Sequence, residues 1–161
     1  MIPAEFPPVK PGDTGALGEQ MVYEALRRMP EEWIVIHNCW RHVLKESPWR
    51  ENAEHISYEA DFIVLIPGCG ILVMEVKNWS RARVHNGRWE RWDSAKGRFC
   101  PVKHGSPLNQ AYLAAGNLRT ELMKRFSWGR YEASDMEFRS LAVLLGKAEN
   151  YADLEAVRED E

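Results

Sequence analysis

The chain has 161 residues, 45% of them hydrophobic, which fits one domain with a full core, and its formal net charge of −3 does not indicate a strongly basic nucleic-acid-binding protein. No apolar run approaches the ~20 residues that a membrane-spanning helix requires, and the proline-rich N-terminus does not resemble a signal peptide. Three cysteines, an odd number without paired spacing, indicate free thiols and a reducing, cytoplasmic setting.

The first predicted element is a helix that follows a proline-rich lead-in over residues 1–12. Asp13 or Thr14 can cap this helix, which is expected to run to about Met29. Its apolar stripe consists of Leu17, Met21, Ala25, Leu26 and Met29. At about 100° per residue, Glu19 falls on the border of the stripe, where it either reaches inward or only complements the helix dipole.

A short strand and a loop are predicted next. Residues 33–37 are apolar and predict a strand, whereas residues 41–55 are polar and predict a loop. His37, Cys39 and His42 lie close enough in sequence to suggest a zinc site, but a fourth ligand is missing nearby. Ordinary residues at the end of a strand are therefore the preferred interpretation.

The most informative stretch is a predicted β-hairpin over residues 61–77, with a turn at Pro67-Gly68-Cys69-Gly70. Its second strand is apolar on both faces, which indicates a central strand covered on two sides. Asp61, Glu75 and Lys77 nevertheless interrupt this apolar sequence. Because burying unpaired charge is unfavourable, such groups persist when they neutralise one another or hold a metal. Carboxylate oxygens at this density suit Mg²⁺ or Mn²⁺.

The pairing of the two strands decides whether these charges can meet. A four-residue loop would set Asp61 opposite Val76 and turn its carboxylate away from Glu75. A working site therefore requires an odd-numbered loop, a bulge or a bend at Asp61. The favoured pairing sets Asp61 opposite Lys77, with Glu75 diagonal to it.

Basic residues follow this hairpin. Asn86-Gly87 between strand-forming residues predicts a second hairpin over 84–89 with a type I′ turn. The basic side chains in this region are Arg81, Arg83, Arg88, Arg91, Lys96, Arg98, Lys103 and His104. They either contact a phosphate backbone or form a solvated surface. Likewise, Trp79, Trp89 and Trp92 either stack on unpaired bases or, in the preferred interpretation, cover the edge of the core.

A second helix and a last strand complete the predicted domain, which spans residues 13–147. Pro107 starts a helix that runs to about Phe126, with an inner stripe of Leu108, Ala111, Tyr112, Ala115, Leu118 and Leu122. Residues 140–145 predict a strand. Residues 148–161 form an acidic tail or helix with net charge −5, which leaves +2 on the remainder of the chain.

Four segments of this sequence match a known family in order: Gly18-Glu19, residues 59–64, residues 70–79, and residues 107–110, which read Pro-Leu-Asn-Gln. Together they resemble the nuclease-related domain (NERD), a branch of the PD-(D/E)xK nuclease superfamily. The resemblance covers roughly residues 15–125. Two features depart from the pattern: the segment 39–56 is long and polar, and Ala114 stands where some relatives have a tyrosine.

The resemblance implies an α/β fold in which helices flank a central mixed sheet, with the core order α-β-β-β-α-β. It also implies a Mg²⁺- or Mn²⁺-dependent nuclease that acts on DNA. Asp61, Glu75 and the backbone carbonyl of Val76 would hold the metal, and Glu19 would be a direct or water-mediated ligand. Lys77 would orient the attacking water and offset negative charge.

Two supporting residues complete the expected site. Gln110 would position water or Lys77 by hydrogen bonds. Glu59, two residues before Asp61, is an outer ligand or, in the preferred interpretation, an exposed residue at the start of a strand. The alternative function is a catalytically inactive module of the same fold that binds nucleic acid or a partner protein, either alone or within a larger helicase-type chain.

Overall fold

The structure is a computed structural model that describes residues 3–45, 54–103, 105–126 and 136–149. The elements in chain order are α1 (Thr14–Leu26), β1 (Ile34–Lys45), β2 (Glu54–Ile66), β3 (Gly70–Lys77), β4 (Arg81–His85), β5 (Arg88–Asp93), β6 (Arg98–Pro101), α2 (Pro107–Arg125), β7 (Phe138–Leu144) and β8 (Lys147–Glu149). Most of the predicted acidic segment, residues 150–161, lies outside the described residues.

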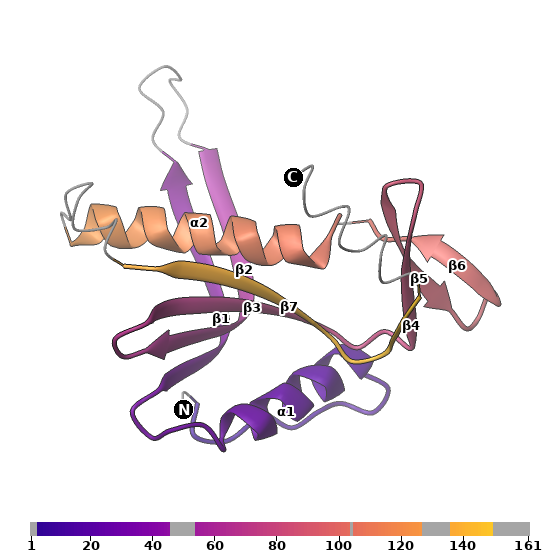
Figure 1. Ribbon diagram of the computed structural model, residues 1–161, viewed down its shortest axis with the longest axis horizontal. Coiled ribbons are helices and arrows are strands. Elements are labelled where there is room, and N and C mark those ends of the chain that lie inside the picture. Colours follow the sequence, from indigo (N-terminus) through magenta and orange to yellow (C-terminus); the bar gives the residue numbers. More distant parts are fainter. Residues whose placement is uncertain (1–2, 46–53, 104, 127–135, 150–161) are drawn as a thin grey trace.

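The main sheet has the strand order β1-β2-β3-β7, in which β7 runs parallel to β3 and the other neighbours are antiparallel. The two helices lie on opposite faces of this sheet (Figure 1). The elements α1, β1, β2, β3, α2 and β7 give the predicted core order α-β-β-β-α-β, with three strands inserted before α2. The expected mixed sheet flanked by helices is therefore confirmed.

Alternating side chains of β3 build a core on each face of this sheet. On the α1 side, Met74 and Val76 pack in a cluster with Phe62 and Tyr23. On the α2 side, Ile71 and Val73 pack with Ala114 and Ala115, among others. Both faces of β3 are thus covered, as its two-sided apolar sequence predicts.

The second sheet, with strand order β6-β5-β4-β8, extends the main sheet beyond its end. β3 leads into β4, and β7 leads into β8. β7 pairs in parallel with β3 in the main sheet, and β8 pairs in parallel with β4 in the second sheet. At this junction a Cβ added to Gly146 would lie 1.6 Å from the carbonyl oxygen of Trp79, so only glycine fits. Asn86 and Gly87 both have positive φ angles between β4 and β5, which confirms the predicted hairpin.

The first helix begins as predicted but faces the sheet with a different stripe. Asp13 caps it by accepting a hydrogen bond from the N–H of Ala16, and the helix ends at Leu26 rather than near Met29. Leu17 and Met21 were predicted to be inside, but they are 44% and 60% exposed, and Val22 and Tyr23 are buried instead. Close packing explains this rotation, because a Cβ on Gly18 would lie 2.6 Å from Cβ of Asn78.

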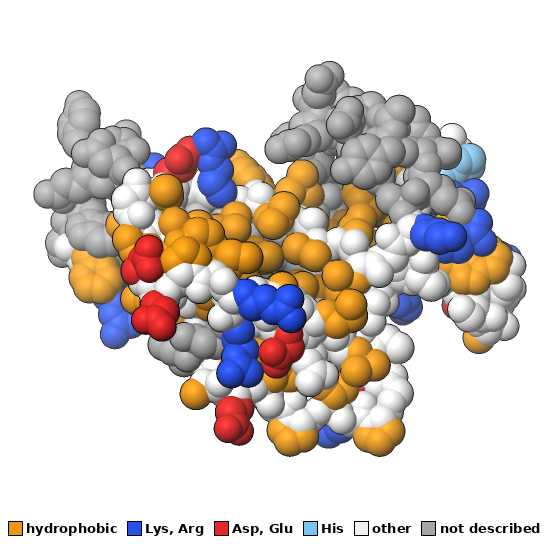
Figure 2. All heavy atoms as spheres, turned by 60° about the horizontal axis from the view of Figure 1, so that its bottom comes forward, with side chains coloured by type: hydrophobic (Ala, Val, Ile, Leu, Met, Phe, Trp, Pro, Cys, Tyr) orange, Lys and Arg blue, Asp and Glu red, His pale blue; other side chains and the backbone are white. Residues whose placement is uncertain are grey.

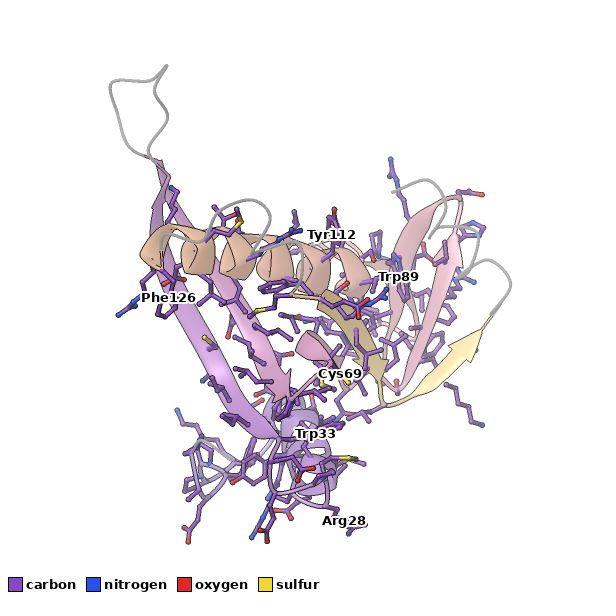
Figure 3. The ribbon with its side chains drawn as sticks, turned by 60° about the vertical axis from the view of Figure 1, so that its left-hand side comes forward. Arg28, Trp33, Cys69, Trp89, Tyr112 and Phe126 are labelled. Atoms are coloured by element: carbon purple, nitrogen blue, oxygen red, sulfur yellow. The ribbon has the colours of Figure 1, made fainter. Side chains whose placement is uncertain are left out.

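The second helix also packs through small residues. Ser106 caps it, Pro107 starts it, and it ends at Arg125, one residue before the predicted end. Ala111, Ala114 and Ala115 are buried. Tyr112 was predicted on the inner stripe, but it is 66% exposed and points away from the sheet (Figure 3). Alanines let the helix approach the sheet closely, so the larger side chain beside them turns outward.

The predicted loop over residues 41–55 is wrong at both ends. β1 continues to Lys45 and β2 begins at Glu54, and these two residues pair with each other. The pair forms a hairpin arm that extends beyond the rest of the sheet (Figure 1), and residues 46–53 lie outside the described part. A two-stranded arm needs no buried face, so its polar sequence gave no strand signal.

The α1 side of the molecule carries exposed apolar surface. Figure 2 turns this side forward and shows hydrophobic side chains gathered across its middle, with acidic and basic side chains around them. Leu17 and Met21 contribute to the exposed apolar surface, as does Leu141 of β7, which alternates with side chains that face α2. Neither of the two described helices combines the length and apolarity that a bilayer crossing requires.

Candidate functional site

The β2–β3 hairpin sets the position of Asp61. Ile66 pairs with Gly70, so the loop contains the three residues 67–69, and positive φ angles at Gly68 and Gly70 allow this turn. The turn is therefore one residue shorter than the predicted 67–70, and of the three alternatives for a working site the structure has the odd-numbered loop. The favoured pairing of Asp61 with Lys77 is wrong by two residues, because the register from Ile66–Gly70 to Phe62–Met74 brings Asp61 level with Glu75.

Strands β2 and β3 stop pairing at the position of Asp61. The β2–β3 ladder ends at Phe62 and Met74, and the β1–β2 ladder omits the position of Asp61, where Asn38 has a φ of 54°. Oδ2 of Asp61 accepts a hydrogen bond from the N–H of Val76 at 2.6 Å. A side chain thus replaces the backbone acceptor that a continued ladder would supply. We call this point the fork, and it comprises Asp61, Glu75, Val76 and Lys77.

The fork brings three predicted residues together. The register brings Asp61 level with Glu75, close enough for the charge of Glu75 to add to the raised pKa of Asp61, for which burial is the larger cause. Nζ of Lys77 forms an ion pair with Oε1 of Glu75. Glu75 is only 6% exposed, whereas Lys77 is half-buried at the edge of the fork. The fork therefore contains two carboxyl groups and only one lysine to balance their negative charge.

The surroundings of the two acids favour their neutral forms. Burial raises the pKa of Asp61 to about 7, and the charge of Glu75 adds to this effect, while the hydrogen bond from Val76 opposes it. Burial also raises the pKa of Glu75, against the hydrogen bond and charge of Lys77. Carboxyl groups whose pKa values are raised in this way are common in functional sites, including sites that bind a cation.

Glu19 reaches the fork from α1. Its charge contributes to the raised pKa values of both Asp61 and Glu75. Its Oε2 lies 2.8 Å from Nε2 of His37 on β1. Among the described residues, no group of three or more His, Cys, Asp and Glu side chains is arranged to hold a metal ion. Glu19 is therefore a neighbour of the Asp61–Glu75 pair rather than a third member of a formed cluster.

His37 is a residue that the sequence pointed to for a different reason. It was considered as a zinc ligand with Cys39 and His42, but its imidazole contacts Glu19, and the side chain of His42 lies outside the description. The signal that could have identified its role is a polar residue inside an otherwise apolar strand, at 33–37.

The backbone carbonyl of Val76 faces the gap of the fork. The N–H of Leu145 on β7 bonds to the carbonyl of Lys77 at 3.1 Å, so the backbone groups of Lys77 point toward β7. Backbone groups alternate between the two edges of a strand, and those of Val76 therefore point toward β2, as its bond to Asp61 shows. The carbonyl of Val76 and the carboxylate of Asp61 thus lie at this gap, and Glu75, paired with Lys77, is the next residue along β3.

The remaining predicted site residues lie around the fork at different depths. Gln110 is half-buried in the first turns of α2 and takes part in interactions of its own. Glu59 is exposed, and its charge adds to the raised pKa of Glu75. Lys103 is exposed on the connection between β6 and α2.

The predicted arginines divide between the two faces of the second sheet. Arg81 lies over the rings of Trp92 and Phe99, with its guanidinium carbon 4.7 and 5.1 Å from their centroids. Arg83 lies 4.1 Å from the ring of Phe99. We call Arg81, Arg83, Trp92 and Phe99 the arginine–aromatic face. Alternation along β5 adds Arg88 to this face and puts Arg91 on the opposite one.

Two further residues of the second sheet bear on its charge and packing. Glu90 neutralises Arg83 through an ion pair of 2.7 Å. Trp89 extends from β5 toward the α2 side (Figure 3). Its Nε1 is buried without a hydrogen-bond partner in the described part of the chain. The side chain of Trp89 therefore packs within this part of the structure, whereas Trp92 lies on the arginine–aromatic face.

A mixed sheet flanked by two helices, with an acidic pair and a lysine where its central strands separate, defines the class as nuclease-like α/β proteins. The family model described as Nuclease-related domain (NERD) matches residues 14–145, and the chain belongs to this family. Searches among curated proteins and among solved structures found no match.

Proposed function

We propose that this chain is a Mg²⁺- or Mn²⁺-dependent deoxyribonuclease that hydrolyses phosphodiester bonds at the fork. The observation that carries the proposal is the meeting of Asp61, Glu75 and Lys77 at the fork: the register brings Asp61 level with Glu75, 14 positions away in the chain, and Glu75 is paired with Lys77. A fold that had no use for these groups would gain stability by replacing them with apolar side chains.

The donor set of the fork fits a hard divalent cation. Mg²⁺ binds through one or two carboxylates and keeps several waters, so Asp61, Glu75 and the carbonyl of Val76 are sufficient ligands. Glu19 would join them directly or through a water. When bound, the metal would lower the pKa of a water and stabilise charge on the phosphate.

The other residues of the site have supporting roles in this proposal. The ammonium group of Lys77, held beside Glu75, would orient the attacking water and offset the negative charge that develops on phosphorus-bound oxygens. Gln110 would position the water or Lys77 by hydrogen bonds. Glu59, which is exposed, would contribute only through its negative charge, which adds to the raised pKa of Glu75.

The arginine–aromatic face is the proposed path of the DNA strand. It begins at Arg81, four positions after Lys77, and Arg88 extends it. Cations beside aromatic rings suit a phosphate backbone with adjoining bases. Arg91, on the opposite face, and Lys103 remain predicted contacts of the same DNA.

A catalytically inactive module that binds nucleic acid or a protein is the second candidate. One observation favours it: the part of the chain that the structure describes contains no group of three potential metal ligands. We also propose a cytoplasmic location, with support from Cys39, Cys69 and Cys100, which are free thiols.

Cleavage assays separate these candidates. Purified protein is incubated with labelled linear, circular and single-stranded DNA in Mg²⁺, in Mn²⁺ and in EDTA. Cleavage that requires the metal supports the nuclease, whereas binding without cleavage under every condition supports the inactive module. The three substrates also distinguish attack at ends from attack within the strand.

A further inference from the structure

We propose that His37 is a positioning residue of the metal site, which holds the carboxylate of Glu19 in a fixed place beside the fork. This inference rests on the proposed function, because it assigns a task to α1 in metal binding.

The contact itself joins two elements that are distant in sequence. Nε2 of His37 on β1 lies 2.8 Å from Oε2 of Glu19 on α1. An ionised carboxylate only accepts hydrogen bonds, so Nε2 carries the hydrogen and donates it. Oε1 of Glu19 is then the oxygen that remains for a cation or a metal-bound water.

Aromatic packing fixes the imidazole and therefore the hydrogen bond. The ring centroid of His37 lies 4.7 Å from that of Phe6, 4.9 Å from that of Phe62 and 6.3 Å from that of Tyr23. His37 is 8% exposed. Because the ring cannot rotate freely among these neighbours, Glu19 is held by a rigid donor rather than by a flexible surface side chain.

The position of His37 in the sheet links it to the fork. It pairs with Phe62, the residue next to Asp61, and the following residue, Asn38, is where the β1–β2 ladder is interrupted. Burial is the main cause of the raised pKa values of Asp61 and Glu75, and the charge of Glu19 makes a smaller contribution in the same direction. His37, which donates the hydrogen bond to Glu19, therefore pairs with the residue directly next to Asp61, one of the proposed metal ligands.

Groups that orient a metal ligand in this way typically contribute about 10- to 100-fold to metal affinity or activity. We therefore expect His37→Phe, which keeps an aromatic ring but removes the donor, to weaken Mn²⁺ binding by roughly 10-fold or more. Isothermal titration of Mn²⁺ into the full chain measures this directly, without any cleavage. Thermal unfolding without metal checks that the variant is folded.

Matched variants separate positioning from packing. Tyr23→Phe removes the hydrogen bond from the Tyr23 hydroxyl to the carbonyl of Pro3 in the same aromatic cluster, and it leaves Glu19 untouched. Its Mn²⁺ affinity should equal that of the unmodified chain. In a Glu19→Gln background, His37→Phe should cause no further loss, because the group that it positions has already lost its charge.

A conservative pair covers the case in which His37→Phe does not fold. The amide nitrogen of His37→Gln reaches the place of Nε2, whereas that of His37→Asn is too short. Gln should thus retain Mn²⁺ affinity and Asn should lose it.

Three results would overturn the inference. They are unchanged affinity in His37→Phe, an equal loss in Tyr23→Phe, and an equal loss in the Gln and Asn variants. If the unmodified chain binds no Mn²⁺, the proposed function fails as well, whereas normal binding and cleavage alongside an unaffected His37→Phe variant reject the role of His37 alone.

Discussion

The fork and the second sheet both carry charged side chains on strands, but they treat those charges in opposite ways. At the fork, burial raises the pKa of Asp61 and Glu75 and one lysine serves two acids. In the second sheet, a hydrogen bond from Lys96 holds the pKa of Asp93 below its usual value, and Arg83 is paired with Glu90. Asp93 and Arg83 of the second sheet are thus paired with neighbouring charges, whereas the fork retains charges that a ligand could satisfy.

The largest expected effect comes from removing the charges of the fork. Glu75→Ala or Lys77→Ala should lower metal-dependent DNA cleavage by about 10²-fold or more, because each removes electrostatic stabilisation at the reacting phosphate. Glu75→Ala should remain folded because it removes one of two buried acids that repel each other, and thermal unfolding checks Lys77→Ala, which leaves both acids without their cation. Glu90→Ala is the matched control, because it removes a strand glutamate that also pairs with a basic residue. Equal loss of cleavage in the Glu90 variant would remove the distinction between the two regions.

A second prediction concerns pH. The folded-state pKa of Asp61, about 7, lies above its ordinary value of 3.8, so the native state holds this proton more tightly than the unfolded chain does. Without metal, the free energy of unfolding should therefore decrease as pH rises from about 4 to about 7. The effect is on the order of a few kcal/mol, because one pKa unit corresponds to about 1.4 kcal/mol.

Urea unfolding at several pH values tests this expectation. Asp61→Asn should flatten the decrease, and Mg²⁺ should offset it at neutral pH, because the cation stabilises the ionised carboxylates. Asp93→Asn should not flatten it, because the pKa of Asp93 is lowered rather than raised. An unchanged pH profile in Asp61→Asn would contradict the assigned burial of this acid.

The junction between the two regions gives a third prediction. Gly146→Ala should destabilise the protein by about 1 to 3 kcal/mol, the usual range for an overpacked position, because its Cβ would overlap the carbonyl of Trp79. Gly116→Ala in α2 is the control: nothing lies within 4 Å of its Cβ, and alanine favours a helix by up to about 1 kcal/mol. Thermal unfolding should move the two melting temperatures in opposite directions. A stable Gly146→Ala protein would indicate that the sheets can separate at this point.

The smallest effect is expected on the arginine–aromatic face. Arg81→Gln or Arg83→Gln should weaken DNA binding and reduce the slope of log affinity against log salt by about 1, as expected for one lost phosphate contact. Arg91→Gln, on the opposite face, should change the slope less. Fluorescence anisotropy in the Glu75→Ala background measures binding without cleavage. Equal slopes for all variants would leave the second sheet with a structural role alone.

The sequence predicted the parts of the fold that have a strong local signal. The turn at Asn86-Gly87 and the start of α2 at Pro107 were correct because each depends on the backbone preferences of one or two residues. The two-sided apolar sequence of β3 correctly predicted a central strand. The inner stripe of α1 was wrong because it depends on a distant contact, the close approach of Gly18 to Asn78.

The candidate site was predictable in composition but not in arrangement. Asp61, Glu75 and Lys77 were recognisable as charges in an apolar hairpin, but their register depends on a three-residue turn that Gly68 and Gly70 make possible. The hydrogen bond from His37 to Glu19 spans 18 residues and two elements, so no local pattern contained it. Long-range contacts of this kind require the folded chain.

The most direct test of the central claim is the position of Mn²⁺ in crystals of the protein, measured by anomalous scattering. We predict an anomalous peak in contact with the carboxylates of Asp61 and Glu75 and lost in crystals of Glu75→Ala. A peak elsewhere, or none at a Mn²⁺ concentration that supports cleavage, would contradict a metal-dependent site at the fork.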